Sequence, residues 1–171
     1  KKINVPSKIV AALAVSMLSS AAFGQSIVVD NTTAVVNTAN HVSTATITFP
    51  ASTVAGLQFT LTYNNADLGL PTGTAPHPEI ISSDAAISCQ VNTVGTALCT
   101  GFAASGFLAS PITVGFRFDT GATAVPAPGS PLTLSGVDFF DGSANSIPGA
   151  TSTNGSVIIT TAPPNILVSY A

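Results

Sequence analysis

Seven acidic residues and two histidines are the side chains of this sequence that could perform acid–base chemistry or hold a metal ion. Hydrolysis of a glycosidic bond needs two carboxylates held across the scissile bond. The only glutamate is Glu79, in a proline-flanked segment, while Asp138 and Asp141 are separated by two phenylalanines in a strand-like segment. These positions do not predict a pair of carboxylates across a substrate, so we expect no hydrolase site.

The histidines do not suggest nucleophilic catalysis either. A catalytic triad needs a serine or cysteine nucleophile beside the histidine. His41 opens a strand-like segment without such a partner, and His77 lies in Ala-Pro-His-Pro, which predicts a rigid, exposed loop. We therefore predict that the chain is not an enzyme.

The segment Asp-Gly-Ser-Ala-Asn places Asp141, Ser143 and Asn145 at alternate positions. That spacing can present side-chain oxygens to a hard cation such as calcium. The bidentate glutamate that completes a calcium loop is missing from the segment, and a simple Asp-Gly turn explains the same residues. The turn is our prediction, with calcium as the alternative and no other cofactor expected.

The two cysteines, Cys89 and Cys99, lie on either side of Val94. A hairpin that turns within Asn92–Thr96 would set them opposite each other, and cross-strand neighbours lie about 5 Å apart at Cβ, near disulfide reach. The sequence therefore predicts a disulfide, with two buried free thiols as the alternative. Two thiols without a nearby histidine do not make a metal site.

The first residues have the pattern of an export signal. Lysines precede a short apolar run over Ile9–Leu18, and Ala22-Phe23-Gly24 fits the small residues before a cleavage site. The run is well short of the roughly 20 residues of a membrane-spanning helix. We predict a signal-peptide helix over residues 1–24 and a mature chain that is secreted, extracellular or at the cell surface, with periplasmic transit in a bacterium.

Cleavage after residue 24 would remove Lys1, Lys2 and Lys8 and leave Arg117 as the only cation. Against seven acids, the mature net charge is 1 − 7 = −6. A surface with a single cation cannot neutralise phosphates, so nucleic acid and anionic lipid are excluded as partners. The remaining 171 − 24 = 147 residues suit one domain, and no membrane span is expected in the mature chain.

Strand patterns recur through residues 25–161, and no helical period of useful length follows the signal segment. The clearest is Gly56–Tyr63, in which every second residue is apolar. Further strands are expected at Ser26–Asp30 with Ala34–Val36, His41–Phe49, Glu79–Ile81, the Cys89–Cys99 hairpin, Ser110–Thr120, Leu132–Phe140 and Ser156–Thr161. Seven to nine short strands of this kind predict an all-β, antiparallel sandwich of the jelly-roll type.

Glycines and prolines divide these strands. The apolar phase of Leu132–Phe140 switches after Gly136, which predicts a β-bulge, and Gly121–Pro131 is expected to be a flexible loop. Asn154-Gly155 predicts a turn. Two prolines then interrupt the pattern, so residues 162–171 are expected to be a linker, the start of a further module, or an edge strand of the same sandwich.

Two stretches resemble the cohesin domain family. Within Val54–Leu70, a Gly-apolar-x-Phe-x-Leu-x-Tyr strand precedes a short turn and Leu68, although the turn opens with Asn64 where the family usually has Asp. Leu132–Thr160 is similar to the end of a cohesin, where a strand with Phe and Asp leads through a polar segment to Asn-Gly-Ser and a last strand. The cysteine-containing middle diverges from the family.

This resemblance implies a nine-stranded sandwich related to bacterial carbohydrate-binding modules, with a non-catalytic role in assembly or surface attachment. In cellulosomes the cohesin partner is a dockerin, bound across one sheet face. The alternatives are a carbohydrate-binding module for polysaccharide degradation and a structural domain of a larger bacterial surface protein. Because the chain has no tryptophan, a protein partner on a Thr/Ser-rich sheet face or edge strand is favoured over a polysaccharide.

The residues that follow Tyr63 have two interpretations. Asn64, Asn65 and Asp67 are residue types that cap backbone groups in turns, with the tyrosine ring packed beneath. The same polar side chains could instead contact a partner. The turn is our prediction and binding the alternative.

Overall fold

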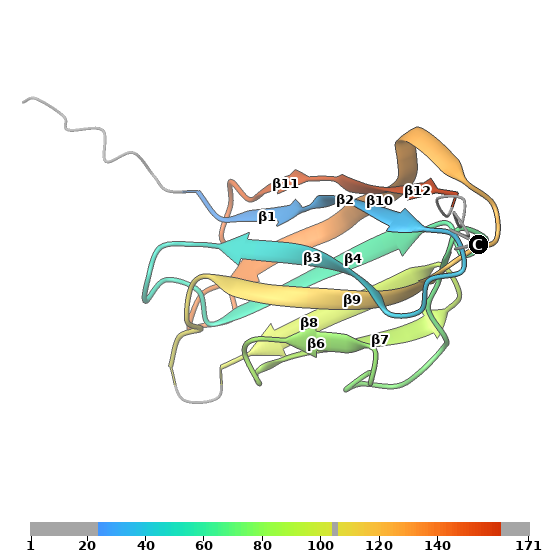
Figure 1. The fold of residues 1–171 in the computed structure, drawn as a ribbon. Helices are drawn as coiled ribbons and strands as arrows, with labels where there is room; N and C mark the ends of the chain where they lie inside the picture. Colours follow the sequence, from blue (N-terminus) through green and yellow to red (C-terminus); the bar gives the residue numbers. More distant parts are fainter. Residues whose placement is uncertain (1–23, 104–105, 162–171) are drawn as a thin grey trace, which may run out of the picture.

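The computed structural model describes residues 24–103 and 106–161, which form a sandwich of two β-sheets (Figure 1). The expected signal segment, up to residue 23, and the expected linker at residues 162–171 lie outside the described residues. Within the described ranges there is no helix that is long and apolar enough to cross a membrane. The strands are β1 (Ser26–Val29), β2 (Asn31–Val35), β3 (His41–Thr48), β4 (Gly56–Tyr63), β5 (Leu68–Gly69), β6 (Ile80–Ser82), β7 (Ile87–Thr93), β8 (Thr96–Phe102), β9 (Ile112–Thr120), β10 (Val125–Phe140), β11 (Thr151–Thr153) and β12 (Gly155–Thr160).

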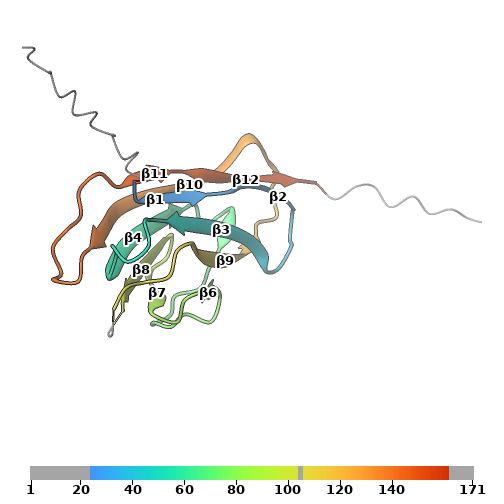
Figure 2. The same ribbon diagram turned by 90° about the vertical axis from the view of Figure 1, so that its left-hand side faces the viewer.

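The two sheets have six strands each. The first sheet has the order β11-β1-β3-β9-β5, with β6 also paired to β9, and the second has the order β2-β12-β10-β4-β8-β7. Figure 2 shows the layers from the side. The predicted all-β sandwich is confirmed. The described residues form 12 strands rather than seven to nine, because the first predicted strand is divided and strands such as β5 and β11 are too short to show a period.

Alternation of apolar and polar residues places the core between the sheets. In β4 and β9, every second side chain points inward and is buried, while Gln58, Thr62 and Arg117 stay on the exposed faces, as the pattern predicts. Aromatic rings join the layers: Tyr63 of the second sheet and Phe118 of the first have ring centroids 5.1 Å apart. The largest fully buried side chains are Phe59, Phe116, Phe118, Phe139, Ile27, Ile47, Leu57, Leu61, Leu68, Leu70, Ile112 and Leu132.

The first and last strands pair in parallel, so the sheets are mixed rather than wholly antiparallel. β1 pairs with β11 in the first sheet, and β2 pairs with β12 in the second. Only Asp30 separates β1 from β2, and only Asn154 separates β11 from β12, so both segments cross between the sheets side by side. Asn154-Gly155 is therefore a sheet crossing rather than the predicted turn, and a Cβ at Gly155 would overlap the carbonyl oxygen of Asp30.

The strand β10 contains the β-bulge that the phase switch predicts. Its register with β4 shifts between Ser135 and Asp138, and Gly136 has a φ of 57°. This left-handed backbone conformation favours glycine. The shift lets Leu134 and Phe139 both face the core although they are an odd number of residues apart.

The expected loop at Gly121–Pro131 is mostly strand. β10 begins at Val125, and its pairing with β12 resumes at Ser130 after a register shift. The intervening prolines lack N–H groups and are accommodated in this irregular part of the ladder. Composition alone indicated a loop because prolines are rare in regular strands.

The Pro71–Pro78 segment covers the edge of β7, and His77 anchors it. Gly73 forms a bridge with Val91, and the backbone N–H of His77 donates to the carbonyl of Cys89 at 3.0 Å. The His77 side chain is only 3 % exposed, which corrects the predicted exposed position. Its ring is buried because its nitrogens satisfy backbone groups of the same segment.

Both ring nitrogens of His77 have partners. The N–H of Glu79 donates to Nδ1 at 3.2 Å, so Nε2 carries the proton and donates to the carbonyl of Pro71 at 2.9 Å. The ring packs directly over Gly73, where a Cβ would lie 2.6 Å from it. The segment thereby closes an edge strand whose free backbone groups would otherwise invite pairing with another chain.

Candidate functional site

The Asp141–Asn145 segment forms a turn after β10. One oxygen of Asp141 accepts hydrogen bonds from the backbone N–H groups of Ser143 at 2.8 Å and Asn145 at 2.9 Å. Hydrogen bonds to the Asp141 carboxylate lower its pKa. The backbone N–H of Asn145 has the largest effect, followed by the side-chain amide of Asn145 and the backbone N–H of Ser143. Both carboxylate oxygens of Asp141 thus accept hydrogen bonds within the turn, which supports the turn interpretation of these residues. In the part of the chain that the structure describes, no three His, Cys, Asp or Glu side chains group together as metal ligands.

The residues between β4 and β5 also bond to one another. Asn64 accepts a hydrogen bond from the N–H of Ala66 at 3.1 Å and donates from its amide to Asp67 at 2.8 Å. Asp67 also accepts a hydrogen bond from the hydroxyl of Ser130 on β10 at 2.9 Å, whereas Asn65 is exposed. Asn64 and Asp67 therefore hold the turn and attach it to the second sheet.

Tyr63 packs beneath this turn. Its hydroxyl lies 3.4 Å from the carbonyl oxygen of Leu70, and the side chain is 4 % exposed. Burial raises the pKa of the tyrosine hydroxyl, partly offset by a backbone hydrogen bond of Gly95. The junction is a packed corner of the sandwich.

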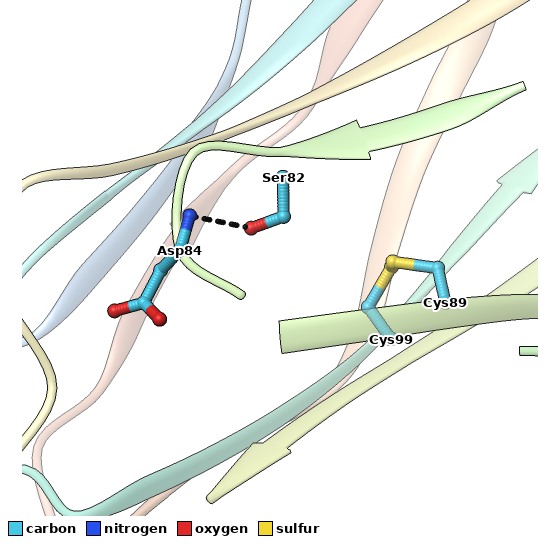
Figure 3. The surroundings of a disulfide bond; sticks show 4 residues. All are labelled: Ser82, Asp84, Cys89 and Cys99. Atoms are coloured by element: carbon cyan, nitrogen blue, oxygen red, sulfur yellow. Dashed lines mark hydrogen bonds between the residues drawn. A yellow bond between two sulfur atoms is a disulfide. The ribbon is translucent and has the colours of Figure 1, made fainter. Parts of the chain in front are cut away.

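Cys89 and Cys99 form the predicted disulfide, with an S–S distance of 2.01 Å (Figure 3). They lie directly opposite each other on β7 and β8, which turn at Val94 and Gly95. A hollow of about 410 Å³ between β6 and β7 is bordered by Cys89 and by Asp84. Asp84 lies in the turn between these strands, where its N–H donates to the hydroxyl of Ser82 at 3.2 Å (Figure 3). The disulfide thus joins the two outermost strands at this edge of the second sheet.

His41, Thr32 and Ser43 form a chain of hydrogen bonds that joins the two sheets. The Nε2 atom of His41 lies 2.8 Å from the hydroxyl of Thr32, which lies 3.3 Å from the hydroxyl of Ser43. Burial lowers the pKa of His41, and the charge of Asp30 acts in the opposite direction. Because Ser43 is fully buried, this group stabilises the sandwich and does not offer a nucleophile to solvent.

The outer face of the second sheet carries an apolar line along β8. Val94 lies in the turn before β8 and is 53 % exposed, and Leu98 and Phe102 follow at four-residue intervals. Alternation places Leu98 and Phe102 on the same side of the strand, opposite to the buried Cys99. Phe102 is 51 % exposed, and its ring covers Gly56 of β4.

Polar side chains without charge surround this line. Leu98 lies between Thr60 of β4 and Gln90 of β7, and Thr100 lies between Gln58 and Ser88. We define the β8 surface as Leu98 and Phe102 with the outward residues around them: Gln58, Thr60, Thr62, Ser88, Gln90 and Thr100. The sequence alone did not reveal this surface, because Leu98 interrupts the polar positions of an otherwise regular alternation.

The outer face of the first sheet differs in its charges. Val28, Val42 and Ile81 are exposed there, and Val42 lies opposite Arg117 in the ladder between β3 and β9. Arg117 is the only cation in the described ranges, and it shares a shallow hollow of about 250 Å³ with Glu79 and Asp119. Charged groups of both signs thus border the exposed aliphatic residues.

Solved cohesin domains are similar to this structure. The seventh ScaB type I cohesin from Pseudobacteroides cellulosolvens has a TM-score of 0.63 at 19 % identity, covering 86 % of this chain and 99 % of its own. The cohesin of a type I cohesin–dockerin complex from Clostridium thermocellum has a TM-score of 0.65 at 12 % identity, and the match covers 80 % of this chain and 99 % of the cohesin. A non-cellulosomal cohesin from the archaeon Archaeoglobus fulgidus has a TM-score of 0.58 at 16 % identity, and the match covers 81 % of this chain and 92 % of the cohesin.

Comparisons with models of known protein families and with curated protein sequences find no match. The likeness therefore lies in the arrangement of the strands, which the cohesin-like stretches of the sequence had implied. It extends over most of this chain and nearly all of each cohesin structure named above. The chain has the cohesin fold.

Proposed function

We propose that the chain is a non-catalytic binding module that joins a protein partner through the β8 surface. The observation that carries this proposal is the outward-facing pair of Leu98, which is half-buried, and Phe102, which is 51 % exposed, among uncharged polar side chains of the neighbouring strands. Protein interfaces combine an apolar centre depleted of charge with a polar rim. The one acidic residue paired with this surface, Asp138 of β10, lies opposite Gln58, with β4 between it and β8. A partner that covers Leu98 and Phe102 can therefore leave this carboxylate at the hydrated rim.

A polysaccharide partner has less support. Sugar rings stack on exposed aromatic platforms, and Phe102 is the only aromatic residue of the β8 surface. The similar structure from Clostridium thermocellum was solved as a cohesin–dockerin complex, which supports a protein partner. A dockerin is therefore the first class of partner to test.

We also propose that the domain is exported and comprises residues 25–161. The lysine-rich, then apolar, then small-residue pattern before residue 25 supports export, and disulfides are typical of oxidising compartments. Fusion of residues 1–24 to a reporter enzyme that is active only outside the cytosol tests the targeting step. A reporter that stays inactive, although it is produced, would contradict export.

The binding proposal is tested by immobilising the full chain and titrating it with purified dockerins and with exported proteins fractionated from the source organism. The double variant Leu98→Ser with Phe102→Ala removes the apolar centre but leaves the buried face of β8 unchanged. Truncation of a hot-spot residue at the centre of an interface costs about 2 kcal/mol or more, so if Leu98 and Phe102 form that centre, we expect binding to weaken by a factor of roughly 30 or more. Val42→Ser on the first sheet is the matched control and should leave the affinity unchanged.

Two results would contradict the proposal. A partner that binds the double variant as tightly as the original chain does not use the β8 surface. Retention of the chain on cellulose, xylan or chitin, with no protein bound, would favour the carbohydrate-binding alternative. Circular dichroism of each variant establishes that the fold is retained.

A further inference from the structure

The strand β6 has one edge that faces away from its sheet. β6 pairs with β9 only, and β9 pairs with β3 on its other side (Figure 1). The N–H of Arg117 on β9 donates to the carbonyl of Glu79 at 2.9 Å, so the backbone of Glu79 faces β9. Backbone groups alternate in direction along an antiparallel strand, and those of Ile80 and Ser82 therefore point away from β9.

Three backbone groups on this edge are available to another strand. The N–H of Ile80 donates to the carbonyl of His77 at 3.1 Å, but no hydrogen bond between described residues engages the Ile80 carbonyl or the N–H and carbonyl of Ser82. On β7, by contrast, Cys89 and Val91 bond to the segment that covers its edge. That segment ends before β6 begins and leaves the edge of β6 uncovered.

The hollow of about 410 Å³ between β6 and β7 lies beside this edge. Ile80, Ile87 and Cys89 border it, and all three side chains are buried. In a strand added to β6, every second side chain would lie on the same face as Ile80. An aliphatic side chain at such a position would enter the hollow and contact these apolar groups.

Among the described residues that border the hollow, only Asp84 is charged. One oxygen of its carboxylate accepts a hydrogen bond from the N–H of Ala86 at 2.9 Å, and no hydrogen bond between described residues engages the other oxygen. Figure 3 shows this carboxylate at the turn that follows Ser82. A lysine or arginine in the added strand would complement its charge.

The charges also distinguish a partner protein from a second copy of this chain. Two β6 strands that pair antiparallel through their free edges would set Ser82 of each copy opposite Ile80 of the other. That register brings Asp84 of one copy close to Glu79 of the other. Like charges on adjacent strands are destabilising, so a second copy is disfavoured.

We propose that β6 binds an extended segment of a partner protein as an added strand, with an aliphatic residue in the hollow and a lysine or arginine beside Asp84. In this mode of recognition the backbone hydrogen bonds provide affinity, and the side chains that enter pockets provide specificity. The site is separate from the β8 surface, because β6 belongs to the first sheet. The proposal therefore does not depend on the function proposed for the β8 surface.

Titration of the isotope-labelled full chain with a synthetic peptide, followed by amide NMR, tests the site. The peptide is acetylated and amidated and has the sequence Thr-Lys-Thr-Val-Thr-Lys-Thr, so a lysine can lie beside Asp84 whichever way the peptide runs. We expect saturable shifts of the amide signals of Ser82 and its neighbours at millimolar peptide, and slower hydrogen exchange of the Ser82 N–H. A peptide with glutamates in place of the lysines should bind more weakly.

Two variants test the two kinds of contact. Ser82→Pro removes an N–H that points away from β9, a position at which an edge strand tolerates proline. We expect this variant to bind the lysine peptide roughly fivefold more weakly, the effect of one lost hydrogen bond. Ser82→Ala is the matched control, because it loses the same hydroxyl but keeps the N–H and should bind as the original chain does. Asp84→Asn should weaken binding roughly two- to fivefold, as expected for an exposed ion pair.

Several results would overturn the proposal. The absence of saturable shifts, or shifts confined to the β8 surface, would show that β6 does not bind the peptide. Unchanged binding by Ser82→Pro would exclude the added strand, and equal affinity for the lysine and glutamate peptides would exclude the proposed chemistry of the partner. Circular dichroism establishes that each variant is folded; if Ser82→Pro does not fold, Asp84→Asn and the glutamate peptide decide.

Discussion

At the scale of single residues, His77 is the polar side chain on which the covering segment depends most. His77→Ala leaves a cavity over Gly73 and removes the partners of the Pro71 carbonyl and the Glu79 N–H. We expect the free energy of unfolding to fall by about 2–4 kcal/mol, the sum of a cavity and unsatisfied polar groups. Urea denaturation measures this loss, and a change no larger than that of the exposed control Asn65→Ala would contradict the anchoring role.

His41 should make the stability of the domain depend on pH. Burial lowers its pKa in the folded state, so the unfolded chain takes up a proton more readily. The full stability of the folded domain is therefore present above pH 6.5, the ordinary pKa of histidine. It decreases as the pH falls below 6.5 toward the lower pKa of His41 in the folded state. We expect urea midpoints measured from pH 8 to pH 5 to decrease less steeply for His41→Gln than for the original chain. Parallel curves would show that His41 does not carry this dependence.

The sequence predicted some of these residues and not others, for a physical reason. Alternation predicts the buried positions of β4 because one strand contains the whole pattern. The burial of His77 depends on its own segment folding over β7, and the role of Leu98 depends on its polar neighbours in β4 and β7. Such contacts join residues that no local pattern relates.

At the scale of elements, the Cys89–Cys99 bond should stabilise the hairpin of β7 and β8. A closed loop with a sequence separation of 10 restricts the unfolded chain by roughly 2–4 kcal/mol. We therefore expect Cys89→Ala, or reduction of the disulfide, to give a folded but less stable domain with a lower melting temperature. Calorimetry with and without reductant measures the difference, and the double variant Cys89→Ala with Cys99→Ala should show no effect of reductant. An unchanged melting temperature on reduction would contradict a stabilising disulfide.

The strands themselves were largely predictable, whereas their partners were not. Gly56–Tyr63 has the predicted bounds, and the switch at Gly136 identified the bulge, because both features are local. The parallel pairing of β2 with β12 joins residues such as Asn31 and Ser156 from opposite ends of the domain. A sheet crossing and a hairpin turn both need small residues that let two backbone segments approach closely. The sequence Asn154-Gly155 therefore predicted a turn where the structure has a crossing.

At the scale of the whole molecule, the proposed binding surface occupies one side of the sandwich. β10 and β4 separate β8 from β12 in the second sheet. A partner bound on the β8 surface therefore leaves uncovered the strands with which the domain begins and ends.

The same architecture predicts where the domain can be cut. The backbone of Gln25 accepts a hydrogen bond from the N–H of Thr151 at 2.9 Å, and Ile27 and Val29 are buried, so β1 belongs to the core. We expect residues 25–161 to unfold in one cooperative transition with the stability of residues 25–171. Removal of residues 25–30 deletes both buried side chains, each contributing roughly 2–3 kcal/mol, and should unfold a domain of ordinary stability.

Urea denaturation followed by circular dichroism compares the three chains. A folded chain that begins at Asn31 would show that β1 is dispensable, and an unfolded chain of residues 25–161 would show that the domain needs residues beyond Thr161.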